Sequence, residues 1–80
     1  MTDQAILDAF TRILRDVLGD ESIVLTLETK RDDVANWDSF GYVNFIVAVE
    51  IEFHVKFGVA EIESFENVGA IVQQTKELLA

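Results

Sequence analysis

The stretch "NWDSFGYVNFIVAVEIEF", Asn36 to Phe53, sets one small hydroxyl residue, Ser39, directly before a strongly apolar segment. Asp38 and Ser39 are both good helix-capping residues, and apolar residues recur at helical spacing directly after them. The pattern predicts a helix that begins at Ser39 and ends at about His54 or Val55.

The apolar residues of this helix fall into two stripes on a helical wheel that advances about 100° per residue. One stripe holds Tyr42, Phe45, Ile46, Val49 and Phe53, and the nearly opposite one holds Phe40, Val43, Val47 and Ile51. A small bundle has too few elements to surround a helix, so one stripe faces the core and the other must meet something else. We expect the first stripe in the core. We expect the second, with Asp38 and Glu50 beside it, to be a docking surface for partner proteins, unless a short segment and a long loop cover it.

Two further helices are predicted on either side. From Asp3 to Leu18 apolar residues again recur at helical spacing, with Asp3 placed to cap the start and Gly19 to end it. A last helix opens at Glu66 or Asn67 and runs through Leu79. Its expected inner face comprises Val68, Ile71, Val72, Thr75 and Leu79.

The connections complete the predicted fold. Gly19 to Asp38 contains "SIVLTL", which could form a strand, but no second strand signal exists to pair with it. We interpret this segment as a long loop with Leu25 and Leu27 packed onto the helices. After Gly58, "EIESF" can form one short helical turn. The expected fold is all-α: a small four-helix bundle, with three main helices and one short helix, in a single domain spanning residues 1–80.

Composition limits what can stabilise the chain and what it can bind. It has 80 residues, half of them hydrophobic, with no cysteine and one histidine. Disulfides and zinc clusters are therefore excluded, and the core must be plain hydrophobic packing. The acidic stretch "DDVANWD" lacks the glycine and the final glutamate of a calcium loop, so no metal site is predicted.

The formal charge of -9 indicates the kind of partner. It disfavours nucleic acid and anionic lipid and favours basic surfaces on other proteins, although it could also serve solubility alone. The first residues show no basic leader, and no apolar run is long enough to span a bilayer. We expect a cytoplasmic protein.

Ser39 lacks the surroundings of a catalytic serine. A serine nucleophile needs a neighbouring base, but the one histidine, His54, is expected at the far end of the same helix, and no G-x-S-x-G elbow surrounds the serine. No catalytic residue is predicted, and the protein is expected not to be an enzyme. His54 fits an ordinary helix end. On these residues alone Ser39 could be only a helix cap.

The segment "WDSFGYVNFIVAVEIEFHVKF", residues 37–57, resembles the phosphopantetheine attachment segment of acyl carrier proteins and peptidyl carrier domains. The family's Asp-Ser-Leu corresponds to Asp38-Ser39-Phe40, and its "LEEEFG"-like helix end corresponds to Val49 through Phe53. The order of helix, long acidic loop, second helix, short helix and final helix matches the family over nearly the whole chain.

The resemblance implies that Ser39 is the attachment point of a 4'-phosphopantetheine group transferred from coenzyme A. It also implies that Asp38 helps the modifying enzyme to recognise the site. A carrier of this kind holds acyl or aminoacyl groups as thioesters on the arm, which fits the absence of cysteine. The implied partners are a phosphopantetheinyl transferase, a loading ligase and downstream acyl-processing enzymes with basic docking surfaces. Phe40, Val43, Val47, Glu50 and Ile51 are the docking residues we expect, on a monomeric carrier.

Several positions depart from the commonest family pattern. Carriers of general fatty acid synthesis usually have Leu at the position of Phe40 and acidic residues at those of Gly41, Asn44 and Ile51. Trp37, directly before Asp-Ser, resembles discrete carriers of specialised pathways, including secondary-metabolite and modified-lipid assembly. The alternative is an unmodified carrier-like interaction module in which Ser39 is only a cap.

Overall fold

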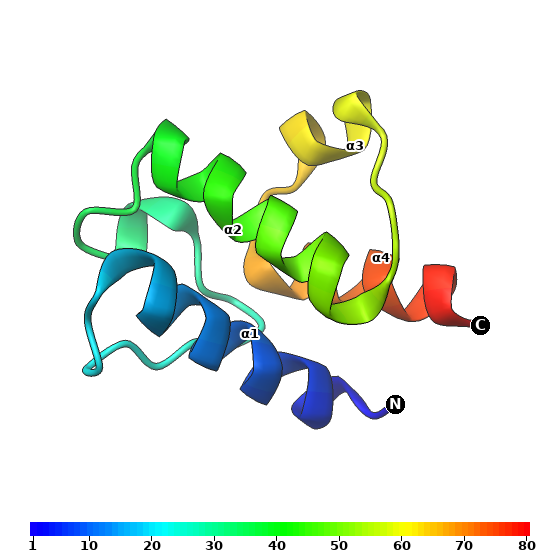
Figure 1. Cartoon of the computed structure of the whole chain (residues 1–80), viewed down its shortest axis with the longest axis horizontal. Coiled ribbons are helices and arrows are strands. Elements are labelled where there is room, and N and C mark those ends of the chain that lie inside the picture. The colour runs from blue at the N-terminus through cyan, green and yellow to red at the C-terminus, as the bar shows by residue number, and fades with distance from the viewer.

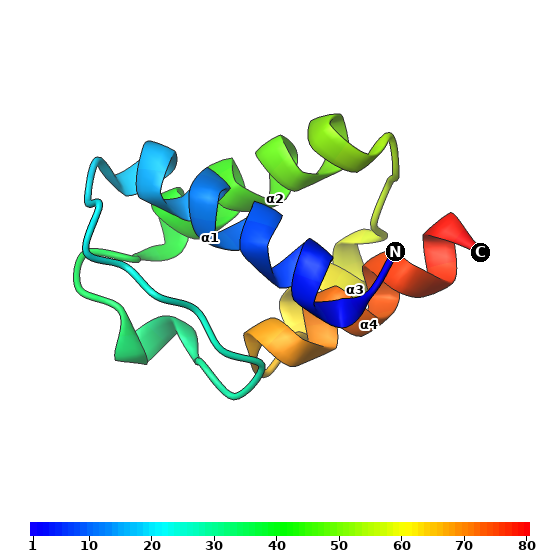
Figure 2. The ribbon, with the colours of Figure 1, turned by 90° about the horizontal axis from the view of Figure 1, so that it is seen from below.

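The computed structural model describes residues 1–80 and contains helices but no strands. Its elements are α1 (Asp3–Leu18), a 3-10 turn η1 (Arg31–Asp33), α2 (Ser39–Phe53), α3 (Val59–Ser64) and α4 (Val68–Leu79). Helix α1 packs against both α2 and α4, and the loop between α1 and α2 returns along α1 toward the start of α4 (Figures 1 and 2). The all-α prediction of three main helices and one short helix is confirmed.

Local capping sets the bounds of α1. Thr2 is the N-cap, and its hydroxyl oxygen accepts a hydrogen bond of 3.1 Å from the backbone N–H of Ala5. The prediction of Asp3 as the cap is wrong by one residue, because Thr2 is also a capping residue and stands at the required spacing from Ala5. Gly19 ends the helix in the left-handed conformation, with φ 65°, as predicted.

Helix α2 begins at Ser39 as predicted and ends at Phe53. His54 is the C-cap residue, in the left-handed conformation with φ 55°, and its backbone N–H donates to the carbonyl of Glu50. The two predicted stripes lie where expected. Phe45, Ile46, Val49 and Phe53 are buried and Tyr42 is half-buried, whereas Phe40, Val43, Val47 and Ile51 are exposed.

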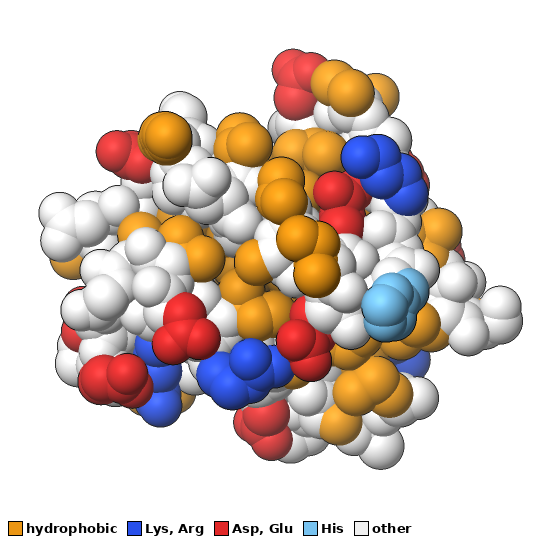
Figure 3. Space-filling view, in the orientation of Figure 1, with side chains coloured by type: hydrophobic (Ala, Val, Ile, Leu, Met, Phe, Trp, Pro, Cys, Tyr) orange, Lys and Arg blue, Asp and Glu red, His pale blue; other side chains and the backbone are white.

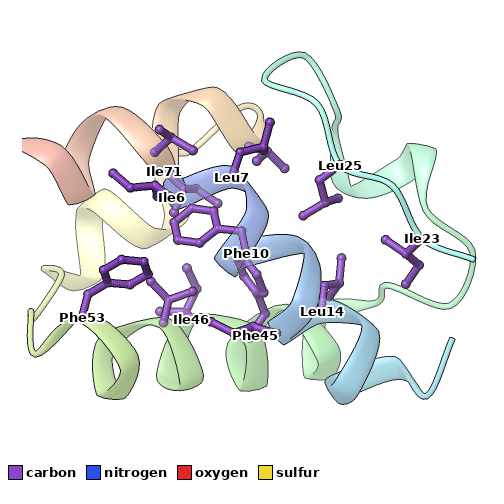
Figure 4. Close-up of a cluster of buried hydrophobic side chains, with 14 of the residues drawn as sticks. Ile6, Leu7, Phe10, Leu14, Ile23, Leu25, Phe45, Ile46, Phe53 and Ile71 are labelled. Carbon is purple, nitrogen blue, oxygen red and sulfur yellow. The ribbon is translucent and has the colours of Figure 1, made fainter. Parts of the chain in front are cut away.

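One cluster of sixteen buried hydrophobic side chains forms the core, and Figure 4 shows a large part of it. Phe10 of α1 lies at its centre and meets Phe45 and Phe53 of α2 edge to face, with ring centroids 5.4 and 5.9 Å away. Such aromatic pairs add to the stabilisation that burial of apolar area provides.

Hydrogen bonds and buried side chains attach the long loop to α1 and to the start of α4. Ile23 and Leu25 are buried, Leu27 is half-buried, and the Arg15 guanidinium donates through Nε to the carbonyl of Ile23 at 2.8 Å. At the start of α4, the N–H groups of Val68 and Gly69 donate to the carbonyls of Thr29 and Leu27, both at 2.8 Å. The absence of a strand and the burial of Leu25 match the sequence interpretation, whereas the 3-10 turn was not predicted.

The C-terminal elements differ from expectation in two details. Helix α3 begins at Val59, two residues before the predicted "EIESF" turn, and the Glu61 carboxylate accepts the N–H of Gly58 at 2.7 Å at its start. Asn67 caps α4, and Val68, Ile71, Val72 and Thr75 are buried as predicted. Leu79 does not belong to the inner face: it is 41% exposed in the last turn, beyond the part of α4 that the other elements cover.

No helix combines the length and the apolar character that a membrane crossing requires.

Candidate functional site

Ser39 is the first residue of α2, and Asp38 is its N-cap. The Asp38 carboxylate accepts a hydrogen bond of 2.9 Å from the backbone N–H of Gly41, so the capping role belongs to Asp38. Ser39 is exposed, and its side chain is not the cap of the helix. Its hydroxyl is therefore presented to solvent on a rigid element.

A cavity of about 480 Å³ opens beside Ser39. The residues that line it come from the end of the long loop, the first turn and a half of α2, the α3 region and the start of α4. They include Lys30, Arg31, Trp37, Ser39, Tyr42, Val43, Ile62, Phe65, Val68 and Ile71. Apolar side chains of the loop end, α2, the α3 region and α4 line part of the cavity. Charged side chains also line it: Lys30, Arg31 and Asp32 from the loop, and Glu63 and Glu66 from the α3 region.

Trp37 is one of the residues that form this wall and is only 5% exposed. Its ring centroid lies 5.3 Å from that of Phe45 and 6.1 Å from that of Tyr42. The indole Nε1 is buried without a hydrogen-bond acceptor. The sequence marked Trp37 only through its resemblance to certain carriers, whereas the structure places it against both the core and the cavity.

Tyr42 joins α2 to α3 across the cavity. Its hydroxyl donates a hydrogen bond of 2.7 Å to the carbonyl of Ile62, and the Arg31 guanidinium carbon lies 5.3 Å from its ring centroid. Burial raises the pKa of the Tyr42 phenol above its ordinary value, and the positive charge of Arg31 opposes that rise. Sequence reasoning assigned Tyr42 to the core stripe and missed these two contacts.

The second apolar stripe of α2 forms an exposed surface. Phe40, Val43, Val47 and Ile51 are 66%, 55%, 46% and 70% exposed. Hydrophobic side chains are visible along α2 in Figure 3. Neither the long loop nor α3 covers these four residues, so the structure rules out the possibility, left open by the sequence, that those segments bury the stripe.

The acidic groups near this stripe are used within the fold. The Glu50 side chain is 12% exposed, and its carboxylate accepts the N–H of Phe57 at 2.8 Å and lies 3.9 Å from the Lys56 ammonium. Glu52 pairs with Arg12 at 3.1 Å. Glu50 therefore holds the connection between α2 and α3, and its docking role stays a prediction.

No set of three or more histidine, cysteine or acidic side chains that could hold a metal ion comes together in the structure. The site combines the exposed Ser39 hydroxyl with a cavity lined by apolar and charged side chains and with an apolar helix face.

Comparison with known proteins agrees with this geometry. No family model matches the chain. The solution NMR structure of the holo acyl carrier protein from Geobacter metallireducens is similar over 91% of this chain and 84% of that chain, with 41% sequence identity and a TM-score of 0.84. Identity and coverage at this level establish common ancestry as well as common fold. The chain belongs to the acyl carrier protein family, as the resemblance of residues 37–57 suggested.

Proposed function

We propose that this chain is an acyl carrier that bears a 4'-phosphopantetheine group on Ser39 and presents acyl or aminoacyl groups to enzymes of a specialised lipid or secondary-metabolite pathway. The observation that carries the proposal is the exposed Ser39 hydroxyl at the start of α2, with Asp38 in the capping position. A member of this family acts as a carrier and makes no bond itself.

The residues around Ser39 fit such a group. The hydroxyl is exposed, so esterification displaces no core contact, and backbone N–H groups and the dipole at the start of α2 tolerate a phosphodiester. The adjacent cavity of about 480 Å³ offers apolar wall to a tethered chain. When attached, the group supplies the thiol that a chain without cysteine lacks.

Asp38 has two roles in this proposal. Its carboxylate fixes the first turn of α2 through the Gly41 N–H, which orients the backbone that carries Ser39. The same carboxylate is exposed next to the hydroxyl, where the modifying transferase can recognise it. Orientation of the nucleophile by a rigid helix start favours a single site of modification.

Partner enzymes dock, in this proposal, on the exposed face of α2 formed by Phe40, Val43, Val47 and Ile51, with Glu50 at its edge. The chain's charge of -9 attracts basic surfaces over a distance, while a few buried apolar contacts supply most of the holding energy. We expect partners, including the transferase and a loading ligase, to offer an apolar groove rimmed by Lys and Arg.

The specialised pathway is supported by residues on that face. Asn44 and Ile51 are exposed and uncharged at positions where carriers of general fatty acid synthesis usually have acidic residues. Gly41 differs from these two positions because it is buried, and a Cβ there would lie 3.2 Å from the Leu18 side chain, which would have to shift to admit a larger residue. The more apolar α2 face favours a dedicated set of partners over the general ones.

The test is transfer of phosphopantetheine from coenzyme A by a phosphopantetheinyl transferase, followed by intact-mass measurement. Wild type and Ser64→Ala should each gain one group, whereas Ser39→Ala should fold and gain none. Ser64 is a suitable control because it is also an exposed serine on a helix. Modification of Ser39→Ala, or none of wild type, would overturn the proposal and favour an unmodified interaction module.

A further inference from the structure

Two positively charged side chains stand apart from the others in this acidic chain. Four of the six basic residues have partners: Arg12 pairs with Glu52, Lys56 with Glu50 and Lys76 with Asp3, and Arg15 donates to the Ile23 carbonyl. Lys30 and Arg31 form no ion pair, and both line the cavity beside Ser39. The two basic side chains that have neither an ion-pair partner nor a hydrogen-bond partner therefore lie next to each other beside Ser39.

The Arg31 side chain is held on the Ser39 side of α2. Its guanidinium lies over the ring of Tyr42, 5.3 Å from the centroid. Tyr42 is three residues after Ser39 on α2, so the two side chains occupy the same face of the helix, one turn apart. Both line the cavity together with Arg31. The Arg31 guanidinium and Ser39 therefore border the same cavity, into which a group attached to Ser39 could extend.

A nearby cation would stabilise a phosphodiester on Ser39. Asp38 places a carboxylate directly before Ser39 and occupies the Gly41 N–H, one of the donors that an anion at the start of α2 would otherwise use. Asp32, Glu63 and Glu66 also line the cavity, so without Lys30 and Arg31 every charged side chain around it would be acidic. An added negative charge would then meet repulsion from several sides.

We propose that Arg31, together with Lys30, is the cationic contact for the phosphodiester carried on Ser39, and that it holds the first part of the arm at the rim of the cavity. This inference rests on the function proposed above. A guanidinium suits the role because its planar donors match phosphate oxygens and form charge-assisted hydrogen bonds. The contact would set where a tethered acyl group leaves the surface of α2.

The first test is a thermodynamic cycle that combines phosphopantetheine attachment with replacement of Arg31 and compares the urea midpoints of the four resulting forms. Apo and holo forms of wild type, Arg31→Gln, Lys30→Gln and Lys56→Gln are unfolded in urea, each holo form verified by intact mass. Lys56→Gln is the matched control, since it removes one positive charge from a side chain that is 88% exposed and does not line the cavity.

Modification should lower the urea midpoint of Arg31→Gln by about 0.3–1 M more than it lowers that of wild type or Lys56→Gln. Lys30→Gln should show a smaller effect in the same direction, and Arg31→Lys should restore part of the loss. If modification changed the urea midpoints of Arg31→Gln and Lys56→Gln equally, the proposed contact between Arg31 and the phosphodiester would be wrong.

The second test observes the phosphate directly. The ³¹P signal of the folded holo protein should move toward its value in urea-unfolded protein when Arg31 is replaced by Gln, and it should not move in Lys56→Gln. A slower transfer reaction with unchanged ³¹P signal and midpoints would place Arg31 in transferase docking and overturn the proposal. The proposal would also be overturned if Arg31→Gln changed only the response of apo protein to added free coenzyme A and left the holo protein unaffected.

These outcomes distinguish failure of the Arg31 contact from failure of the proposed carrier function. If wild type accepts no phosphopantetheine at all, the proposed function fails, and this contact fails with it. If wild type is modified on Ser39 but modification and Arg31 are not coupled, only the contact is wrong.

Discussion

The ring of Phe10 on α1 meets the ring of Phe45 on α2 edge to face, with centroids 5.4 Å apart and planes at 86°. Neither side chain is exposed. Because this pair joins two of the main helices at the centre of the core, Phe45→Ala should lower the free energy of unfolding by about 3–5 kcal/mol. That is a large share of the 5–15 kcal/mol or so typical of whole domains. Urea or thermal unfolding measures it.

Phe40→Ala is the control for this prediction, because Phe40 is on the same helix but 66% exposed. Its free energy of unfolding should stay within about 0.5 kcal/mol of wild type. Similar losses for the two variants would mean that the inner and outer faces of α2 have been assigned wrongly.

Gly69 is predicted to be required for the close packing of the long loop against the start of α4. A Cβ at this position would lie 2.6 Å from the Leu27 carbonyl oxygen, which is the atom that accepts the Gly69 N–H. Gly69→Ala should therefore push the loop from α4 and destabilise the fold by about 1–3 kcal/mol. Gly58→Ala serves as the control, since its nearest neighbour would be a flexible Glu61 oxygen at 3.4 Å. Equal stability of the two variants would show that the loop adjusts freely.

The sequence predicted the helices well because local signals coincide with tertiary burial. Asp38 and Ser39 mark the start of α2, and its two stripes separate cleanly into a buried face and an exposed face. The capping residue of α1 was misplaced because Thr2 and Asp3 are adjacent capping residues. Leu79 fits the periodicity of α4 but lies past the helices that could cover it.

Only part of the candidate site could be predicted from the sequence. Resemblance selected Asp38 and Ser39, but the contacts around them join segments far apart in the chain, such as Tyr42 with Ile62. No periodic pattern encodes such pairs. Glu50 illustrates the same limit: on the wheel it borders the docking stripe, yet its carboxylate binds the N–H of Phe57 in the following loop.

Tyr42 is predicted to titrate at unusually high pH. Burial favours the neutral phenol, so its pKa in the folded protein exceeds the ordinary value of 10.0. The unfolded chain then ionises first, and the stability that Tyr42 contributes is complete below pH 10 and declines as the pH rises through the folded pKa. Phenolate absorbance isolates this group, since the chain has one tyrosine.

Arg31→Gln should raise the pKa of Tyr42 further, because the Arg31 charge opposes the effect of burial. Protein unfolded in urea should titrate near the ordinary value. The same midpoint in folded and unfolded protein would contradict the burial of the phenol.

The exposed face of α2 should be required for partner use but not for folding. Val47 is 46% exposed at the middle of that face, so Val47→Glu should keep the fold while placing a charge in a contact that excludes water. The rate of modification by the transferase and of loading by a cognate enzyme should fall at least severalfold. Circular dichroism and urea unfolding check the fold.

Val24→Glu is the matched control, because Val24 is 72% exposed in the loop and does not belong to α2. It adds the same charge and should leave both rates near those of wild type. If both variants slow the reactions equally, net charge and not the α2 face is responsible.

The attachment of phosphopantetheine to Ser39 is tested most directly by the intact mass of this protein isolated from the cells that make it, followed by fragmentation to place any added group. We expect one phosphopantetheine, free or acylated, and fragments that locate it on Ser39, the exposed first residue of α2. A protein that carries no group in cells with an active transferase, or that carries it on another residue, would contradict the role proposed for Ser39.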